Sequence, residues 1–147
     1  MADAKPEAKP IERDEILRAI ERVVPPGLDP KDAFAAVMCS LERRLTRGEA
    51  IYVLAELPAS VRRFIRTCAM HREEHAPKGD TRAFLEQVAA HLHRSAEEVE
   101  PIAREVLAVV QSRLSARAIS HISRQLPADL QDFLAEARDQ GTPPERR

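Results

Sequence analysis

The segment His71-Arg72-Glu73-Glu74-His75 contains the residue types of this chain that come nearest to catalytic chemistry. Its spacing is His-x-x-Glu-His. Two histidines four residues apart on a helix share a face, where imidazoles bind Zn²⁺ while a glutamate acts as base. Cys68 lies one turn earlier, so Cys68, His71 and His75 would form a three-point metal face.

A solvated helix end is the interpretation that we favour for this segment. It is short and polar, it precedes the turn residues Pro77-Lys78-Gly79-Asp80, and cationic side chains are common near a helix C-terminus. The chain also lacks the large domain and substrate cleft of a metalloprotease. We therefore expect no metal and no cofactor.

A cluster of arginines makes the middle of the chain locally basic, although its formal net charge is −1. Arginines one helical turn apart can contact phosphates or the carboxylates of a partner, and they can equally just solvate a helix. The candidate partner- or anion-binding residues are Arg43, Arg47, Arg62, Arg63 and Arg66. Arg44 and Arg113 are expected instead to cap a carbonyl or form a pair within the fold.

Other catalytic arrangements are not evident in the sequence. Cys39 lies beside an apolar helical stripe, which is typical of a buried structural thiol. The chain has four Gly, none of them in a Gly-x-Gly pattern, so a phosphate-cradling loop is not expected. The sequence therefore favours a protein that is not an enzyme.

Composition predicts an all-α, cytoplasmic protein. Of the 147 residues 44% are hydrophobic and only 3% aromatic, so the core must be aliphatic and rich in good helix formers. Two Cys provide no disulfide framework, and the N-terminal residues have no apolar signal region. No apolar run is long enough to span a bilayer.

Start signals divide the chain into about eight helices. Pro30, Pro58 and Pro127 suit first turns, and capping residues precede the other starts. The expected caps are Asp29, Thr46 with Glu49, Asp80 or Thr81, Ser95 with Glu98, and Ser115. The inward stripes comprise Ile16, Ile20, Val23, Phe34, Val37, Leu41, Leu45, Ala50, Val53, Leu57, Val61, Phe64, Ile65, Cys68, Phe84, Leu85, Val88, Leu92, Val99, Ile102, Val106, Val110, Leu114, Ile119, Ile122, Leu126, Leu130, Phe133, Leu134 and Ala137.

An internal repeat is the strongest signal in the chain. A shift of 69 positions (126 − 57) aligns residues 33–66 with 102–135 without a gap, and capping and apolar positions fall on their counterparts. The identical pairs are Val37/Val106, Arg44/Arg113, Leu45/Leu114, Leu57/Leu126, Pro58/Pro127, Ala59/Ala128 and Phe64/Phe133. We predict two tandem pseudo-symmetric repeats of about four helices that form one helical bundle.

The repeat gives a simple domain map. A disordered tail is expected over residues 1–10, followed by the first helical repeat over 11–75. A link over 76–80 precedes the second repeat, 81–139, and a second disordered tail is expected over 140–147.

Two motifs carry a resemblance to a known family. The run Leu45-Thr46-Arg47-Gly48-Glu49-Ala50, leading to Leu57-Pro58-Ala59-Ser60-Val61-Arg62, resembles the bacterial domain of unknown function 2267. The Phe84-Leu85 helix and Leu126-Pro127-Ala128-Asp129-Leu130 are similar to its second half. The resemblance covers most of residues 14–138. It implies a compact helical fold and a bacterial origin, with no assigned chemistry.

The leading hypothesis is a non-enzymatic helical module for protein interaction or regulation, which binds a protein partner or self-associates and does not enter a membrane. The alternative is a regulator that binds nucleic acid or another anion through the arginine face. A second alternative is a small metal-binding protein or metal-dependent enzyme.

Overall fold

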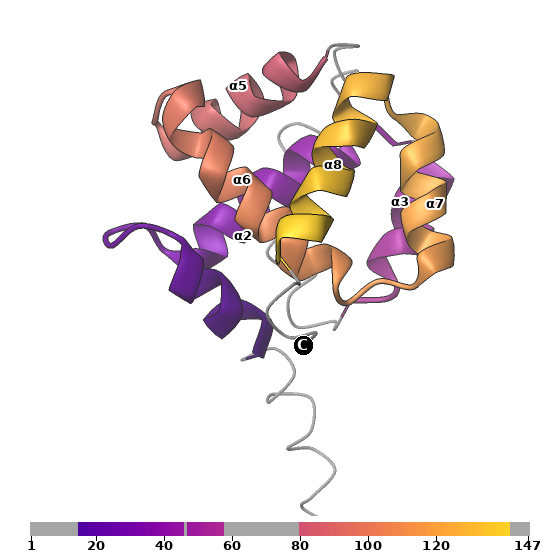
Figure 1. Ribbon diagram of the computed structural model, residues 1–147, viewed down its shortest axis with the longest axis horizontal. Coiled ribbons are helices and arrows are strands. Elements are labelled where there is room, and N and C mark those ends of the chain that lie inside the picture. The colour runs from indigo at the N-terminus through magenta and orange to yellow at the C-terminus, as the bar shows by residue number, and fades with distance from the viewer. Residues whose placement is uncertain (1–14, 46, 58–79, 142–147) are drawn as a thin grey trace, which may run out of the picture.

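The computed structural model describes residues 15–45, 47–57 and 80–141, which are helical throughout apart from the connections and contain no strand. Residues 15–23 form the first helix (Figure 1). The others are α2 (Pro30–Glu42), α3 (Arg47–Leu54), α5 (Thr81–Leu92), α6 (Ala96–Gln111), α7 (Ala116–Gln125) and α8 (Ala128–Gly141). The all-α prediction is confirmed for this part of the chain, and α8 ends two residues beyond the predicted end of the second repeat.

Capping side chains begin the helices where the sequence predicts. Asp29 accepts a hydrogen bond from the backbone N–H of Lys31 and precedes Pro30. Of the two candidates before α5, Asp80 is the cap. Ser95 forms a complete capping box for α6, in which the side chains of Ser95 and Glu98 each accept from the other residue's backbone N–H. Ser115 caps α7, whereas Thr46 lies outside the described residues.

Two helices end earlier than their apolar stripes suggest. The stripes run to Leu45 and Leu114, but α2 ends at Glu42 and α6 at Gln111. In both places the next residues form a tighter turn, in which the backbone N–H of Leu45 or Leu114 bonds to the carbonyl three residues earlier. Such turns satisfy carbonyls that the end of an α-helix leaves without a partner.

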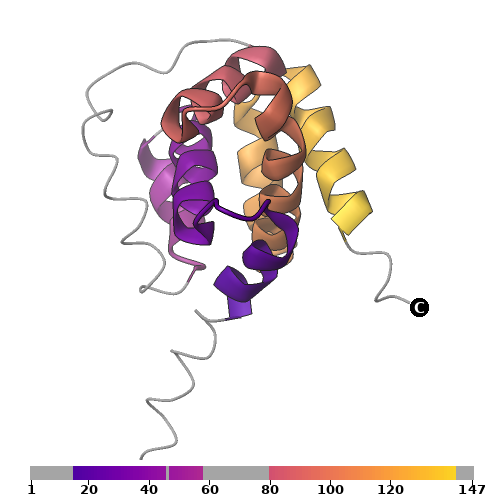
Figure 2. The ribbon, with the colours of Figure 1, turned by 90° about the vertical axis from the view of Figure 1, so that its left-hand side faces the viewer.

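Helices α2, α5, α6 and α8 form the main body of the molecule. The most extensive packing joins α6 to α8, and α5 packs against both α2 and α6. Helices α3 and α7 pack against each other along one edge, at the right in Figure 1. Figure 2 shows the same body from the side, with α8 at the right and α2 at the left.

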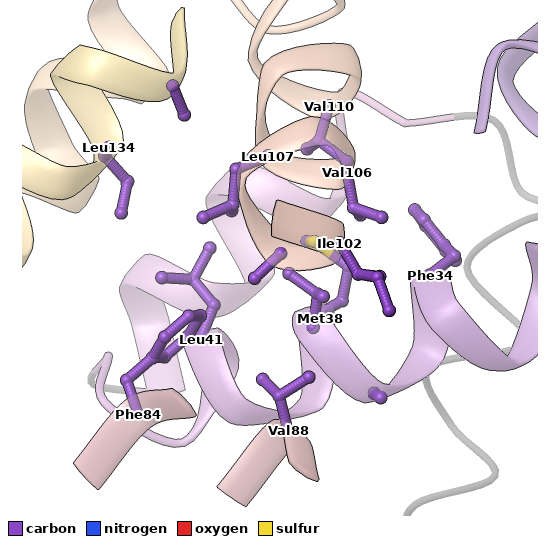
Figure 3. Packing of buried hydrophobic residues seen from close by; sticks show 14 of the residues in the cluster. Phe34, Met38, Leu41, Phe84, Val88, Ile102, Val106, Leu107, Val110 and Leu134 are labelled. Atoms are coloured by element: carbon purple, nitrogen blue, oxygen red, sulfur yellow. The ribbon is translucent and has the colours of Figure 1, made fainter. Parts of the chain in front are cut away.

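The core lies between α2, α5, α6 and α8. Phe34, Met38 and Leu41 of α2 point toward Ile102 and Leu107 of α6 (Figure 3). These side chains are fully or almost fully buried, as is most of the predicted inward set that the structure describes. The core is therefore mainly aliphatic, as the composition predicts.

A few inward predictions are wrong or outside the described residues. Val23 is 37% exposed and Val24 is buried in its place, because the helix of residues 15–23 ends just before it. Leu45, Leu92 and Ile119 are only partly buried. The predicted core residues Val61, Phe64, Ile65 and Cys68 lie outside the part of the chain that the structure describes.

Two helix boundaries and one ring contact follow the repeat offset. Glu42 and Gln111, which end α2 and α6, are 69 positions apart, and so are Arg47 and Ala116, which begin α3 and α7. The rings of Tyr52 and His121, also 69 positions apart, contact each other at 4.7 Å between centroids. The pseudo-symmetric superposition of the two halves itself stays a prediction.

Candidate interaction surface

Most of the sequence-predicted site lies outside the described residues. This holds for Arg62, Arg63 and Arg66 of the arginine cluster and for the metal candidates Cys68, His71 and His75. Of the remaining candidates, Arg43 is half-buried in the turn after α2. Arg47 begins α3, and its side chain is not described. The proposed joint face of these arginines therefore stays a prediction.

Arg44 has the internal role expected from the sequence. Its Nη1 donates to the backbone carbonyl of Ser40 at 2.9 Å and to Oε1 of Gln87 at 2.6 Å. The guanidinium carbon lies 5.5 Å from the centre of the Phe84 ring. Burial, and then the charge of Arg43, lower the pKa of Arg44. Arg44 thus caps the end of α2 and joins it to α5.

Arg113, the counterpart of Arg44 in the repeat, forms an ion pair instead. Its Nη2 lies 3.1 Å from Oε1 of Glu15, and both side chains are substantially exposed to solvent. The expectation that both arginines bond within the fold is confirmed. The contact also ties the turn after α6 to the first helix.

Helices α3 and α7 are held together by polar contacts as well as by packing. Glu56, just after α3, accepts from both the backbone N–H and the hydroxyl of Ser115 at 2.8 Å, so it reinforces the cap of α7. Arg124 donates to Nδ1 of His121 at 3.1 Å, which places the proton of the neutral imidazole on Nε2. His121 in turn contacts the Tyr52 ring.

Three small or apolar residues are exposed on the outer side of α3. Gly48, Ile51 and Ala55 are exposed at positions three and four residues apart, so they share one side of the helix. Ile51 is 63% exposed, well above the 37% of Val23, the other large hydrophobic residue with notable exposure in the described part of the chain. A methyl group added at Gly48 would meet no atom within 4 Å. The backbone at Gly48 therefore borders open space.

The outer side of α7 is basic. Arg117, Ser120 and Arg124 are exposed at the same spacing, and the helix sequence ARAISHISRQ contains no acidic residue. Both helices bury the opposite side, through Val53 in α3 and Ile122 in α7. The exposed apolar and basic residues consequently lie on the outer side of one helix pair, which we call the α3–α7 outer face: Gly48, Ile51, Ala55, Arg117, Ser120 and Arg124.

Several other arginines of the described residues have carboxylate partners, whereas Arg18 and Arg22 of the first helix are exposed like Arg117 and Arg124. Arg104 lies 2.8 Å from Glu100 and 3.2 Å from Glu136, and these contacts raise its pKa. Arg82 pairs with Glu86 at 3.0 Å. Among the ion pairs of the described residues none involves Arg117 or Arg124. The outer face of α7 thus carries two positive charges that no carboxylate of the described structure neutralises.

The α3–α7 outer face offers apolar contact and positive charge as its chemistry. In the described residues no three His, Cys, Asp or Glu side chains gather in a way that would hold a metal ion. No helix among them is both long and apolar enough to cross a bilayer. What the face can do is bury an apolar side chain and attract carboxylates or phosphates.

Sequence reasoning missed this face, although a signal for it exists in the repeat. The three outer positions of α3 differ in residue type from the positions aligned with them 69 residues later. The aligned pairs are Gly48/Arg117, Ile51/Ser120 and Ala55/Arg124. The inner positions of the same helices keep their apolar character. This change of chemistry between aligned positions is the sequence signal for the face, and the exposure of these positions comes from the structure.

The described part of the chain is thus helical, and it carries an exposed surface suited to contacts. The chain belongs to the family described as "Uncharacterized conserved protein (DUF2267)", whose model matches residues 17–133. This confirms the resemblance seen in the sequence motifs. No curated protein and no solved structure matches the chain.

Proposed function

We propose that this chain is a non-enzymatic helical interaction module that binds a protein partner through the α3–α7 outer face. The single observation that carries the proposal is the 63% exposure of Ile51 beside exposed Gly48 and Ala55. An exposed apolar side chain between small neighbours leaves room for a partner to approach closely and bury it. The bacterial and cytoplasmic setting inferred from the sequence belongs to the same proposal.

Two tandem pseudo-symmetric repeats form the scaffold in this proposal. Contact between the counterparts Tyr52 and His121 supports it, because residues near a twofold axis meet their own equivalents. The shared offset of 69 between the ends of α2 and α6 and between the starts of α3 and α7 supports it too. In such a scaffold the inner residues of both repeats must keep their packing. The exposed residues of each repeat can change type and so form a binding surface.

Nucleic-acid binding is the competing function. Arg117 and Arg124 are suitable phosphate ligands, and the nearby Tyr52 ring is half-exposed. The overall charge of −1 provides no long-range attraction for a polyanion, and Ile51 would contribute nothing to phosphate contacts. Cys68, His71 and His75, the residues of the metal-dependent alternative, lie outside the described part of the chain. We propose that the protein needs neither metal nor cofactor.

Site-specific crosslinking in cells tests the proposal. A photo-crosslinking residue at the position of Ser120, on the outer face, should give a defined protein adduct that mass spectrometry identifies. The adduct should disappear with Ile51→Asp and persist with Val23→Asp, a matched control at the other exposed large hydrophobic residue. Equal loss or equal persistence in the two variants, or a nucleic-acid adduct, would contradict the proposal.

A further inference from the structure

We infer that the partner presents an acidic amphipathic helix, with two carboxylates two turns apart flanking an apolar side chain. This inference rests on the proposed function and specifies the chemistry of the partner. Its basis is the arrangement of charge and apolar area on the α3–α7 outer face. Each feature of the expected partner is complementary to one feature of that face.

The charges are the first feature. Arg117 and Arg124 are both exposed, and α7 contains no acid that could pair with them internally. Glu56, just after α3, is already engaged by the backbone N–H and the hydroxyl of Ser115. A guanidinium forms its strongest contacts with carboxylates or phosphates, often with two parallel hydrogen bonds. The face therefore selects a negatively charged partner.

The spacing of the charges is the second feature. Arg117 and Arg124 are seven residues apart, so they lie on the same side of α7 and are separated by about 10 Å along its axis. Carboxylates seven residues apart on a partner helix have that same separation and also share a side. In an extended strand, residues on one side repeat at about 6.6 Å, and neither one nor two such steps gives this distance.

The apolar contact is the third feature, and it distinguishes a peptide helix from a nucleic acid. Ile51 is the repeat counterpart of Ser120, which lies between the two arginines on α7. The packing of α3 against α7 and the Tyr52–His121 contact bring this part of α3 beside the middle of α7. An apolar side chain midway between the partner's carboxylates would cover Ile51, whereas a phosphate backbone has no group for that place.

A synthetic peptide provides the test. The probe is an Ala-rich peptide of about 20 residues, long enough to be helical, with two Glu seven positions apart and a Leu midway. A second peptide of the same composition has its two Glu five positions apart, on different sides of the helix. Binding of each to the full chain is measured by fluorescence anisotropy, with single-stranded oligothymidylate as a third probe.

The first peptide should bind more tightly than the second. The double variant Arg117→Gln/Arg124→Gln should weaken its binding by about tenfold or more. The matched control Arg18→Gln/Arg22→Gln removes the same charge from two exposed positions of the first helix and should change binding by less than about twofold.

Three results would overturn the inference: equal binding of the two peptides, no effect of the α7 double variant, or binding of oligothymidylate without binding of either peptide. The crosslinking experiment separates this failure from failure of the proposed function. An adduct that depends on Ile51, together with no binding of the acidic peptide, would leave the proposed function standing and reject the acidic helix.

Discussion

Helices α3 and α7 begin 69 positions apart in the sequence, and their outer sides differ more in chemistry than their buried positions do. Their inner positions bury apolar residues in both cases, with Val53 matched by Ile122, and the buried Leu57 and Leu126 follow the two helices. Their outer positions change from small and apolar in α3 to basic in α7. The buried side is limited by packing, because cores respond to a change of even one methylene group.

This difference shows where a protein of this fold can acquire a function. Substitutions on the exposed side of a helix usually change stability by no more than about 0.5 kcal/mol, so that side can diverge at little cost. The face formed by Ile51, Arg117 and Arg124 lies wholly on such positions. The comparison therefore separates residues that maintain the fold from residues available for binding.

The largest expected effect concerns the shared inner side. Leu57→Ala and Leu126→Ala should each lower the free energy of unfolding by about 2–5 kcal/mol, because both side chains are buried counterparts. Urea denaturation measures the loss, with Ile51→Ala as an outer-side control that should change it by no more than about 0.5 kcal/mol. A loss below about 1 kcal/mol in only one of the two would show that the two interiors are not equivalent.

The second prediction compares Arg44 and Arg113, which are aligned with each other in the repeat and follow the ends of α2 and α6. Arg44→Ala should lower the free energy of unfolding by about 1–3 kcal/mol, since it removes partly buried charged hydrogen bonds to Ser40 and Gln87. Arg113→Ala removes an exposed ion pair with Glu15 and should lower the free energy of unfolding by less than about 1 kcal/mol. Thermal unfolding of both variants provides the measurement, and the opposite ranking would contradict the roles given to them.

The third prediction concerns the hydrogen bonds from Ser115, the cap of α7, to Glu56, which follows α3. Glu56→Ala removes the carboxylate that accepts from Ser115, and it should destabilise the protein by about 1 kcal/mol. Amide hydrogen exchange should show the greatest loss of protection in the first turn of α7. Glu105→Ala, which removes an exposed glutamate of α6, is the control and should leave that turn unchanged.

The smallest effect on stability is expected on the outer side of α7. Arg117 lies in the first turn of the helix, where the helix dipole favours acids over bases. Arg117→Glu should therefore leave the melting temperature unchanged or raise it slightly, while it weakens binding of an acidic partner. A variant that melts markedly earlier would assign Arg117 to the fold and remove it from the binding face.

Features that depend on neighbours in sequence could be predicted well. The caps Asp29, Ser95 and Ser115 need only a side chain and a backbone N–H two or three residues away, so their patterns are readable directly. The internal roles of Arg44 and Arg113 followed from their equivalence in the repeat. Val23 was placed wrongly because helical periodicity does not say where the helix stops and the chain turns.

The α3–α7 outer face could not be predicted from local patterns. Ile51 fits an ordinary helical sequence, and only the pairing of α3 with α7 shows that its side of the helix faces solvent. The basic side of α7 likewise becomes part of a candidate binding face only because α7 packs beside α3, the helix of Ile51, which is distant in sequence. The sequence directed attention to Arg62, Arg63 and Arg66 instead, because arginines that are close in sequence are easier to recognise.

The central claim is that the partner binds the outer side of α3 and α7, and amide hydrogen exchange tests it most directly. The chain is measured alone and in complex with the protein identified by Ile51-dependent crosslinking. New protection should be concentrated in α3 and α7, with α5, α6 and α8 nearly unchanged. Protection that increases on α5, α6 or α8 while α3 and α7 exchange as before would contradict the account.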